Sequence, residues 1–236
     1  MLPTPKLPRS SLRAVATGAL VAPWLVMTAT FAPAAPAGTG AVAGQVRITK
    51  NGGPKDDRSQ VVVYLEGVAE TARAGAGATP RIRQRDNAFF PGLLVVRRGD
   101  SVEFPNEDKV FHNVFSVSEA ARFDLGLYKS GTSKVVTFRD PGVVDVYCNI
   151  HPEMVAKILV VDTSYYAITG PAGSFRIAGV PAGKYGIVAW QAHGEPRRGT
   201  VTVTPGATAE LSFDLEEVEA SRRHLRKDNT PYGRYK

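Results

Sequence analysis

The sequence contains one cysteine, Cys148, among its 236 residues, so no disulfide bond can form within the chain. It also lacks any long stretch with the three- or four-residue apolar spacing of an amphipathic helix, which excludes a mainly helical fold. A hydrophobic content of 43% and a charged content of 22% are ordinary for a folded protein. The chain therefore folds without disulfides, and its cysteine is either a small buried apolar residue or a ligand.

The first 37 residues have the three parts of a secretory signal. Basic residues come first, an apolar run over 14–32 follows, and small residues around 32–34 end the segment, with Ala34 and Ala37 both possible cleavage sites. Pro23 and the small-residue exit favour cleavage over a retained membrane anchor, which stays the alternative. No cysteine lies nearby, so a lipoprotein cleavage site is excluded. We expect residues 1–37 to be a signal peptide and the protein to be periplasmic or secreted, with membrane contact only if this segment is retained.

The formal net charge of +7 is unevenly distributed. The signal segment holds three cations, and residues 221–236 hold six Lys or Arg against Asp228 alone, which leaves a net charge of −1 on the rest. A short basic end of this kind is typical of a solvated extension. We therefore expect no nucleic-acid partner, and residues 218–236 form a basic tail without an assigned role.

Short runs rich in Val, Ile, Tyr and Phe alternate with Gly, Pro and Asp turns, which predicts an all-β fold made of sandwiches. The predicted strands are 42–49, 60–66, 93–97, 101–104, 133–138, 143–147, 155–161, 174–177, 184–189, 198–203 and 209–215. Only 118–122 and the stretch after Glu216 resemble helices. The Ala- and Gly-rich stretch 71–79 and residues 162–166 indicate boundaries on either side of a central segment.

One loop in this central segment carries the pattern C-x-x-H-x-x-M, formed by Cys148, His151 and Met154 after a predicted strand. Thiolate and thioether are soft ligands that favour copper, and two imidazoles, one thiolate and a weak axial methionine make up the trigonal site of blue-copper proteins. His112, which follows the predicted strand 101–104, is the candidate for the second imidazole. The other two histidines, His193 and His224, are interpreted as surface residues.

Other chemistries suit this pattern less well. Zinc would usually recruit a further Cys, His or carboxylate in place of the thioether of Met154. A nucleophilic Cys–His pair has no use for a methionine and needs an oxyanion site that the sequence does not identify. A binuclear copper centre needs two cysteines, so it is excluded. One copper ion is the interpretation that uses all four residues.

The central segment resembles a cupredoxin over residues 81–161. The matching positions are Phe90-Pro91, Gly99-Asp100, Val102, Asn106, His112-Asn113, Pro141-Gly142, Tyr147-Cys148, His151-Pro152 and Met154. The resemblance implies a Greek-key sandwich over 78–162 and one type 1 copper ion that transfers single electrons between redox proteins, without enzymatic activity. It implies strong ligands at His112, Cys148 and His151, with Met154 axial.

The resemblance also bears on two neighbours of the ligands. It implies that Asn113, next to the first histidine, ties the two ligand loops together. The short loop is most similar to that of amicyanin, but Ile150 stands where amicyanin-like loops have proline. Its backbone N–H is therefore available to donate a hydrogen bond to the Cys148 sulfur, which would stabilise Cu(I) and raise the reduction potential.

A later region resembles a carboxypeptidase regulatory-like, or transthyretin-like, sandwich. The resemblance is carried by the turn-rich stretches 169–177 and 180–185, and the early stretches 40–46 and 61–67 resemble the opening strands of the same fold. We expect one sandwich, made of 38–77 and 163–217, with the cupredoxin segment inserted into it. The alternative assigns the early strands to the copper domain and leaves only the later region separate.

Three functions of different classes are open from the sequence. The first is an exported electron carrier, and the second is a copper carrier or chaperone that uses the same ligands but passes the metal to a partner. The third is a structural or carbohydrate-contacting β protein with a secondary metal site, in which Tyr185, Trp190 and His193 would form the contact surface. Core packing is the more usual use of such aromatic residues.

Overall fold

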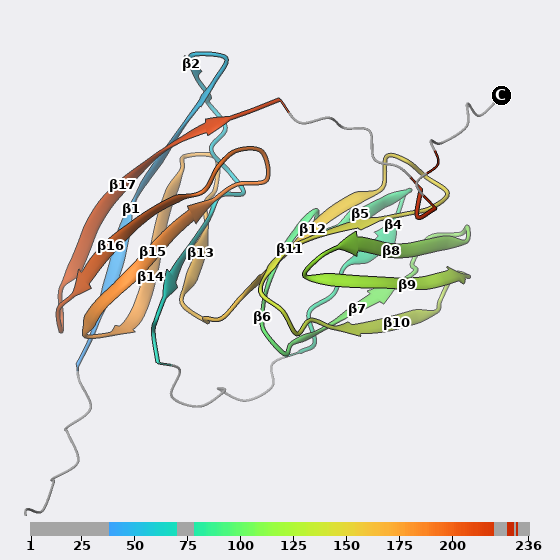
Figure 1. Ribbon diagram of the computed structural model, residues 1–236, viewed down its shortest axis with the longest axis horizontal. Coiled ribbons are helices and arrows are strands. Elements are labelled where there is room, and N and C mark those ends of the chain that lie inside the picture. The colour runs from blue at the N-terminus through green and yellow to red at the C-terminus, as the bar shows by residue number, and fades with distance from the viewer. Residues whose placement is uncertain (1–37, 70–77, 220–225, 229, 231–236) are drawn as a thin grey trace, which may run out of the picture. The chain divides into compact units, whose positions relative to one another are not determined.

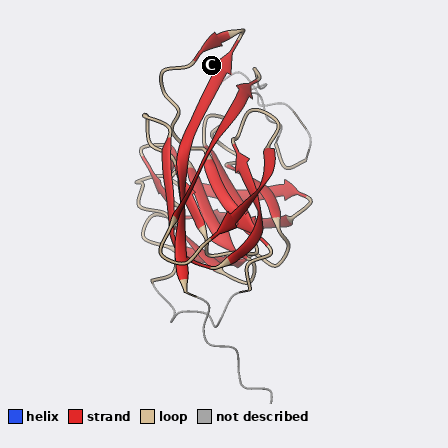
Figure 2. Cartoon of the chain, turned by 90° about the vertical axis from the view of Figure 1, so that its left-hand side faces the viewer, coloured by secondary structure: helices blue, strands red, loops and turns tan. Residues whose placement is uncertain are grey.

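The computed structural model describes residues 38–69, 78–219, 226–228 and 230. All regular elements in these residues are β-strands, and Figure 2 shows strands joined by loops and turns. The all-β prediction is therefore confirmed. No helix of the described residues is long and apolar enough to cross a membrane. The predicted signal peptide, and most of the helix-like stretch after Glu216, lie outside the described residues.

Two sheets that pack on each other form what we call the flanking sandwich. The first sheet contains β14 (Ser174–Pro181), β1 (Thr39–Lys50) and β17 (Thr208–Glu217), with β2 (Gly53–Pro54) paired to β1. The second contains β13 (Tyr166–Ile168), β3 (Val62–Glu66), β15 (Gly183–Trp190) and β16 (Arg197–Val203). Figure 1 shows β1 between β14 and β17, where it runs parallel to β17 and antiparallel to β14.

The core of the flanking sandwich follows from alternation along its strands. In β1 the side chains of Val46 and Ile48 are buried, while the intervening Arg47 is exposed and pairs with Asp214 of β17. Alternate residues of a strand point to opposite faces, so one face of β1 meets the second sheet and the other meets solvent. Gly44 is required by close packing, because a Cβ atom there would lie 1.7 Å from the carbonyl oxygen of Leu211.

The remaining strands form what we call the central sandwich, which carries the candidate ligands. Its larger sheet has the order β6 (Leu93–Arg97), β12 (Val155–Val161), β11 (Gly142–Tyr147), β8 (His112–Ser118) and β9 (Ala121–Tyr128). Facing it is the pair β10 (Ser133–Thr137) and β7 (Ser101–Pro105), accompanied by the hairpin of β4 (Arg83–Arg85) and β5 (Ala88–Phe90).

The core of the central sandwich includes two of the four candidate ligands. Cys148 and Met154 are fully buried and share one hydrophobic cluster with Phe104, Phe138 and Ile158. The opposite face of β12 is also buried, where Leu159 and Val161 belong to a second cluster with Val62 and Trp190 of the flanking sandwich. The indole of Trp190 is therefore used in packing.

The strand predictions hold for most elements and fail for a few. The expected helix at 118–122 is wrong: these residues end β8, form a turn and begin β9. The strands β2, β4, β5, β8, β9 and β13 were not predicted. Strands β1 and β3 pair with strands that follow residue 163, which is the pairing that a split flanking sandwich would have. The domain boundaries themselves stay a prediction.

Candidate metal centre

Three of the candidate ligands come from the loop between β11 and β12. These strands are antiparallel neighbours, and Tyr147 pairs with Val155 at the point where the loop begins and ends. Two backbone hydrogen bonds close the loop, from Cys148 N to Met154 O at 3.3 Å and from Met154 N to His151 O at 3.1 Å. The connection is short, so its thiol, imidazole and thioether groups stay at one end of the sandwich.

His112 comes from a strand that was not predicted. It is the first residue of β8, the strand hydrogen-bonded to β11, and it is paired with Tyr128 of β9. This strand was not predicted, because residues 112–116 are all buried and therefore lack the alternation of buried and exposed residues that is typical of a strand. Val114 faces the core while Phe115 contacts the ring of Tyr147 on the other face. Since β8 lies beside β11, its first residue reaches the end of the sandwich where the loop lies.

The structure brings one donor atom from each of His112, Cys148 and His151 together. The Cys148 sulfur lies 3.9 Å from His112 Nδ1 and 3.8 Å from His151 Nδ1, and the two Nδ1 atoms are 3.2 Å apart. A point equidistant from the three atoms lies about 2.1 Å from each, within the range of about 2.0–2.3 Å typical of metal bonds to imidazole and thiolate. His112 and Cys148 are fully buried, and His151 is partly exposed. This group could hold a metal ion.

A carboxylate sets the tautomer of His112. The His112 Nε2 atom lies 3.1 Å from Asp108 Oδ2. Hydrogen bonds, first from the backbone N–H of Asn87 and also from His112, hold the pKa of Asp108 below its usual range. An ionised carboxylate only accepts, so His112 Nε2 carries the proton and donates it to Asp108. The Nδ1 atom of the same ring faces the other two donor atoms.

The surroundings of His151 favour the neutral form of its ring. Burial lowers its pKa, and the nearby His112 ring lowers it further. The two imidazole rings make an edge contact with centroids 4.9 Å apart. Two ring nitrogens and the Cys148 sulfur thus lie close together at a largely buried point, and a cation between them would be stabilised by all three. The donor set suits copper, because it joins a soft thiolate to two imidazoles.

The remaining predicted site residues stand as follows. Met154 is buried in the same cluster as Cys148, and its role as axial ligand stays a prediction. Ile150 packs against that cluster, and its hydrogen bond to sulfur also stays a prediction. The Asn113 side chain donates to Asp124 of β9 at 2.7 Å, so this bond links β8 to β9 rather than to the Cys148 loop. His193 is exposed, and His224 lies outside the described residues.

The sequence reasoning missed the polar residues around the ligands. Asp108 lies four residues before His112, a spacing that could have been noticed. Asp124 and Lys227 contact each other. Asp124 also contacts Asn113, which is 11 residues away in the chain, and Lys227 contacts Asn149, which is 78 residues away. Only the fold brings these two residues to the site.

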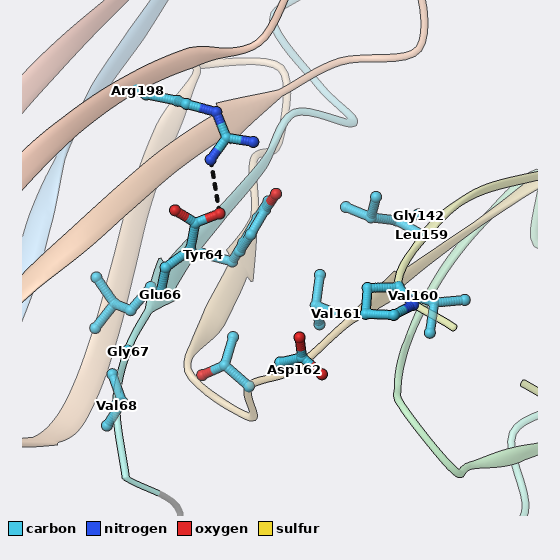
Figure 3. A pocket seen from close by; sticks show the side chains of 13 residues that line it. Tyr64, Glu66, Gly67, Val68, Gly142, Leu159, Val160, Val161, Asp162 and Arg198 are labelled. Carbon is cyan, nitrogen blue, oxygen red and sulfur yellow. Dashed lines mark hydrogen bonds and ion pairs between the residues drawn. The ribbon is translucent and has the colours of Figure 1, made fainter. Parts of the chain in front are cut away.

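A separate cavity of about 500 Å³ is lined by residues of both sandwiches. Figure 3 shows Tyr64 and Glu66 on one side and Leu159 to Asp162 near the other, with Arg198 directed at Glu66. The Arg198–Glu66 ion pair has an N–O distance of 2.7 Å. None of the four candidate ligands lines this cavity.

Comparison with protein families gives one match. Residues 154–216 match the model of the carboxypeptidase regulatory-like domain. The resemblance of the later β region to that family is thereby confirmed. The matched range begins at Met154 and so includes β12, which in the structure belongs to the central sandwich. No curated protein shows significant sequence similarity to this chain.

Several solved copper proteins are similar to part of the chain. A purple cupredoxin from Nitrosopumilus maritimus is 24% identical, with 34% of this chain and 98% of that protein covered and a TM-score of 0.32. A reduced Cu(I) amicyanin variant is 24% identical, with 42% and 97% covered and a TM-score of 0.34. The copper-containing nitrite reductase of Thermus scotoductus SA-01 is 28% identical over 41% of this chain but only 25% of its own length, with a TM-score of 0.36.

Proposed function

We propose that this chain binds one copper ion in a type 1 site and carries single electrons between redox proteins. The observation that supports the proposal is the spacing of the three donor atoms of His112, Cys148 and His151, which one ion can bridge. Two imidazoles and a thiolate are the strong ligands of such centres, and Met154 is available at the end of the same loop for the weak axial position.

The surroundings of the donors suit electron transfer. The copper ion would supply a one-electron couple between Cu(II) and Cu(I). His112 is fixed by Asp108, and Cys148 is fixed by the backbone bond to Met154. Ligands held this firmly would move little between the two oxidation states, which keeps the barrier to electron transfer low. His151 is the partly exposed strong ligand, so its imidazole offers the route for electrons to a partner.

The same burial favours an electron carrier over a copper chaperone. A metal-transfer partner must reach the ion with its own ligands, and full burial of His112 and Cys148 leaves approach only from the side of His151. We also propose, from the signal features of residues 1–37, that the protein acts in the periplasm or outside the cell.

The test is copper titration of the full-length chain, followed by optical and EPR spectroscopy and voltammetry. We expect one equivalent of Cu(II) to give an intense visible band from thiolate-to-copper charge transfer, and a reversible one-electron wave. Cys148→Ser should abolish the band, while His193→Ala, which changes an exposed histidine, should keep it. A wild-type protein that stays colourless with Cu(II), or a coloured Cys148→Ser variant, would overturn the proposal. Rapid loss of copper to a chelator would favour the chaperone.

A further inference from the structure

A short segment of the basic tail, residues 226–228, lies against the candidate metal centre. The backbone N–H of Lys227 donates to Asn149 Oδ1 at 3.2 Å, and its Nζ lies 2.6 Å from Asp124 Oδ2. Figure 1 shows this short segment beside the loop that joins β11 to β12. The tail was expected to be a solvated extension without a role, and these contacts give Lys227 a defined place.

Asp124 connects Lys227 to the strand of the first histidine. Its Oδ1 accepts from Asn113 Nδ2 at 2.7 Å and from the backbone N–H of Gly126 at 2.9 Å, while its Oδ2 faces Lys227. The pairing of β8 with β9 is irregular between Asn113 and Phe115, and Gly126 has a positive φ of 66°. This bulge places the Asp124 carboxylate beside the residue that follows His112.

The contacts form a continuous bridge from one ligand segment to the other. It runs from Asn113 through Asp124 and Lys227 to Asn149. Asn113 directly follows His112, and Asn149 directly follows Cys148. Strands β8 and β11 pair at Tyr147 and Phe115, and the bridge adds a second connection through the residues that directly follow His112 and Cys148.

We propose that Lys227 is a positioning residue of the metal centre, which clamps the Cys148 loop to the strand of His112. The metal-dependent part of this inference rests on the proposed copper function. Lys227 and Asp124 are each about two-fifths exposed, so the ion pair is partly screened by water. A pair of this kind changes an equilibrium by roughly two- to five-fold, which is the size of effect that the variants should show.

The first experiment needs no metal. Amide hydrogen exchange of the metal-free full chain is compared between wild type and Lys227→Met, which keeps the length of the side chain but loses its charge. We expect roughly two- to five-fold faster exchange in the loop 148–154 and at Asn113, with unchanged exchange in β1 and β17. Lys227→Arg should restore protection. Equal exchange in wild type and Lys227→Met would overturn the clamp, whether or not the protein binds copper.

The second experiment uses the copper-loaded chain. Copper loss to a chelator should be roughly two- to five-fold faster in Lys227→Met and in Asp124→Asn, and no faster in the double variant than in either single one. Lys129→Met is the matched control, because Lys129 follows Tyr128, the partner of His112, but does not form the bridge. Additive effects of the two substitutions, or an equal effect of Lys129→Met, would show that charge alone matters and would overturn the proposal.

Discussion

Replacing Asp108 with asparagine tests how the protein sets the electron affinity of the proposed copper site. Asp108 Oδ2 accepts hydrogen bonds from His112 Nε2 at 3.1 Å and from the backbone N–H of Asn87 at 2.8 Å. The oxidised ion carries one more positive charge than the reduced ion, so a carboxylate behind its imidazole ligand favours the oxidised form. Asp108→Asn is therefore expected to raise the reduction potential.

The size of the shift follows from the hydrogen bond. A bond to a charged group contributes about 1.5–3 kcal/mol and a neutral one about 0.5–1.5 kcal/mol, so the substitution removes about 1 kcal/mol. For a one-electron couple, about 1.4 kcal/mol corresponds to about 59 mV, which makes about 40 mV the upper bound. Only the part of the interaction that differs between the two oxidation states contributes, so a rise of about 10–40 mV is expected.

The assay is protein-film voltammetry of the copper-loaded variants at neutral pH. Glu107→Gln is the matched control, because Glu107 is an exposed neighbour and its loss removes the same charge without breaking the bond to His112. The control should shift the potential by much less than Asp108→Asn. A lower potential in Asp108→Asn, or equal shifts in the two variants, would refute the reasoning from this hydrogen bond.

Three further predictions concern the loop and the fold. Ile150→Pro removes the proposed N–H donor to the Cys148 sulfur, so the potential should fall; an unchanged voltammetric potential would remove that donor from consideration. Met154→Leu replaces a buried thioether by a side chain of similar volume, so thermal stability should change by less than about 1.5 kcal/mol, while loss of the axial ligand should raise the potential. Gly44→Ala places a Cβ atom 1.7 Å from Leu211 O and should cost about 1–3 kcal/mol of unfolding free energy in denaturant titrations, while Gly92→Ala, with open space around it, should cost much less.

The strands that were best predicted have clear local patterns. Residues 93–97 and 155–161 form β6 and β12 with the predicted bounds, because apolar runs between turn residues are visible without knowledge of the fold. Strand β8 was missed because both of its faces are buried, which removes the alternation. Strands β4 and β5 have three residues each and are too short to show a period.

The ligands of the candidate site could be predicted from the sequence, whereas the polar residues around them could not. Cys148, His151 and Met154 share one loop, so their spacing is visible in the sequence, and His112 could be selected because few histidines compete with it. The surrounding polar contacts depend on the fold. Lys227 contacts Asn149 across 78 residues, and the bulge that directs Asp124 toward Asn113 arises from the pairing of β8 with β9. No local sequence pattern predicts contacts of this kind.

The position of β1 has a consequence for the order in which the chain can fold. Its parallel partner β17 lies far along the chain, because the paired residues Arg47 and Asp214 are 167 positions apart. Pairing β1 with β17 closes this long segment into a loop, which costs conformational entropy unless the segment has already become compact. The strands β4–β12 pair only among themselves and are complete before β17 is synthesised. These strands can therefore fold early and bring the ends of the segment between β1 and β17 closer together. The first strand to be synthesised would then be among the last to complete its pairing.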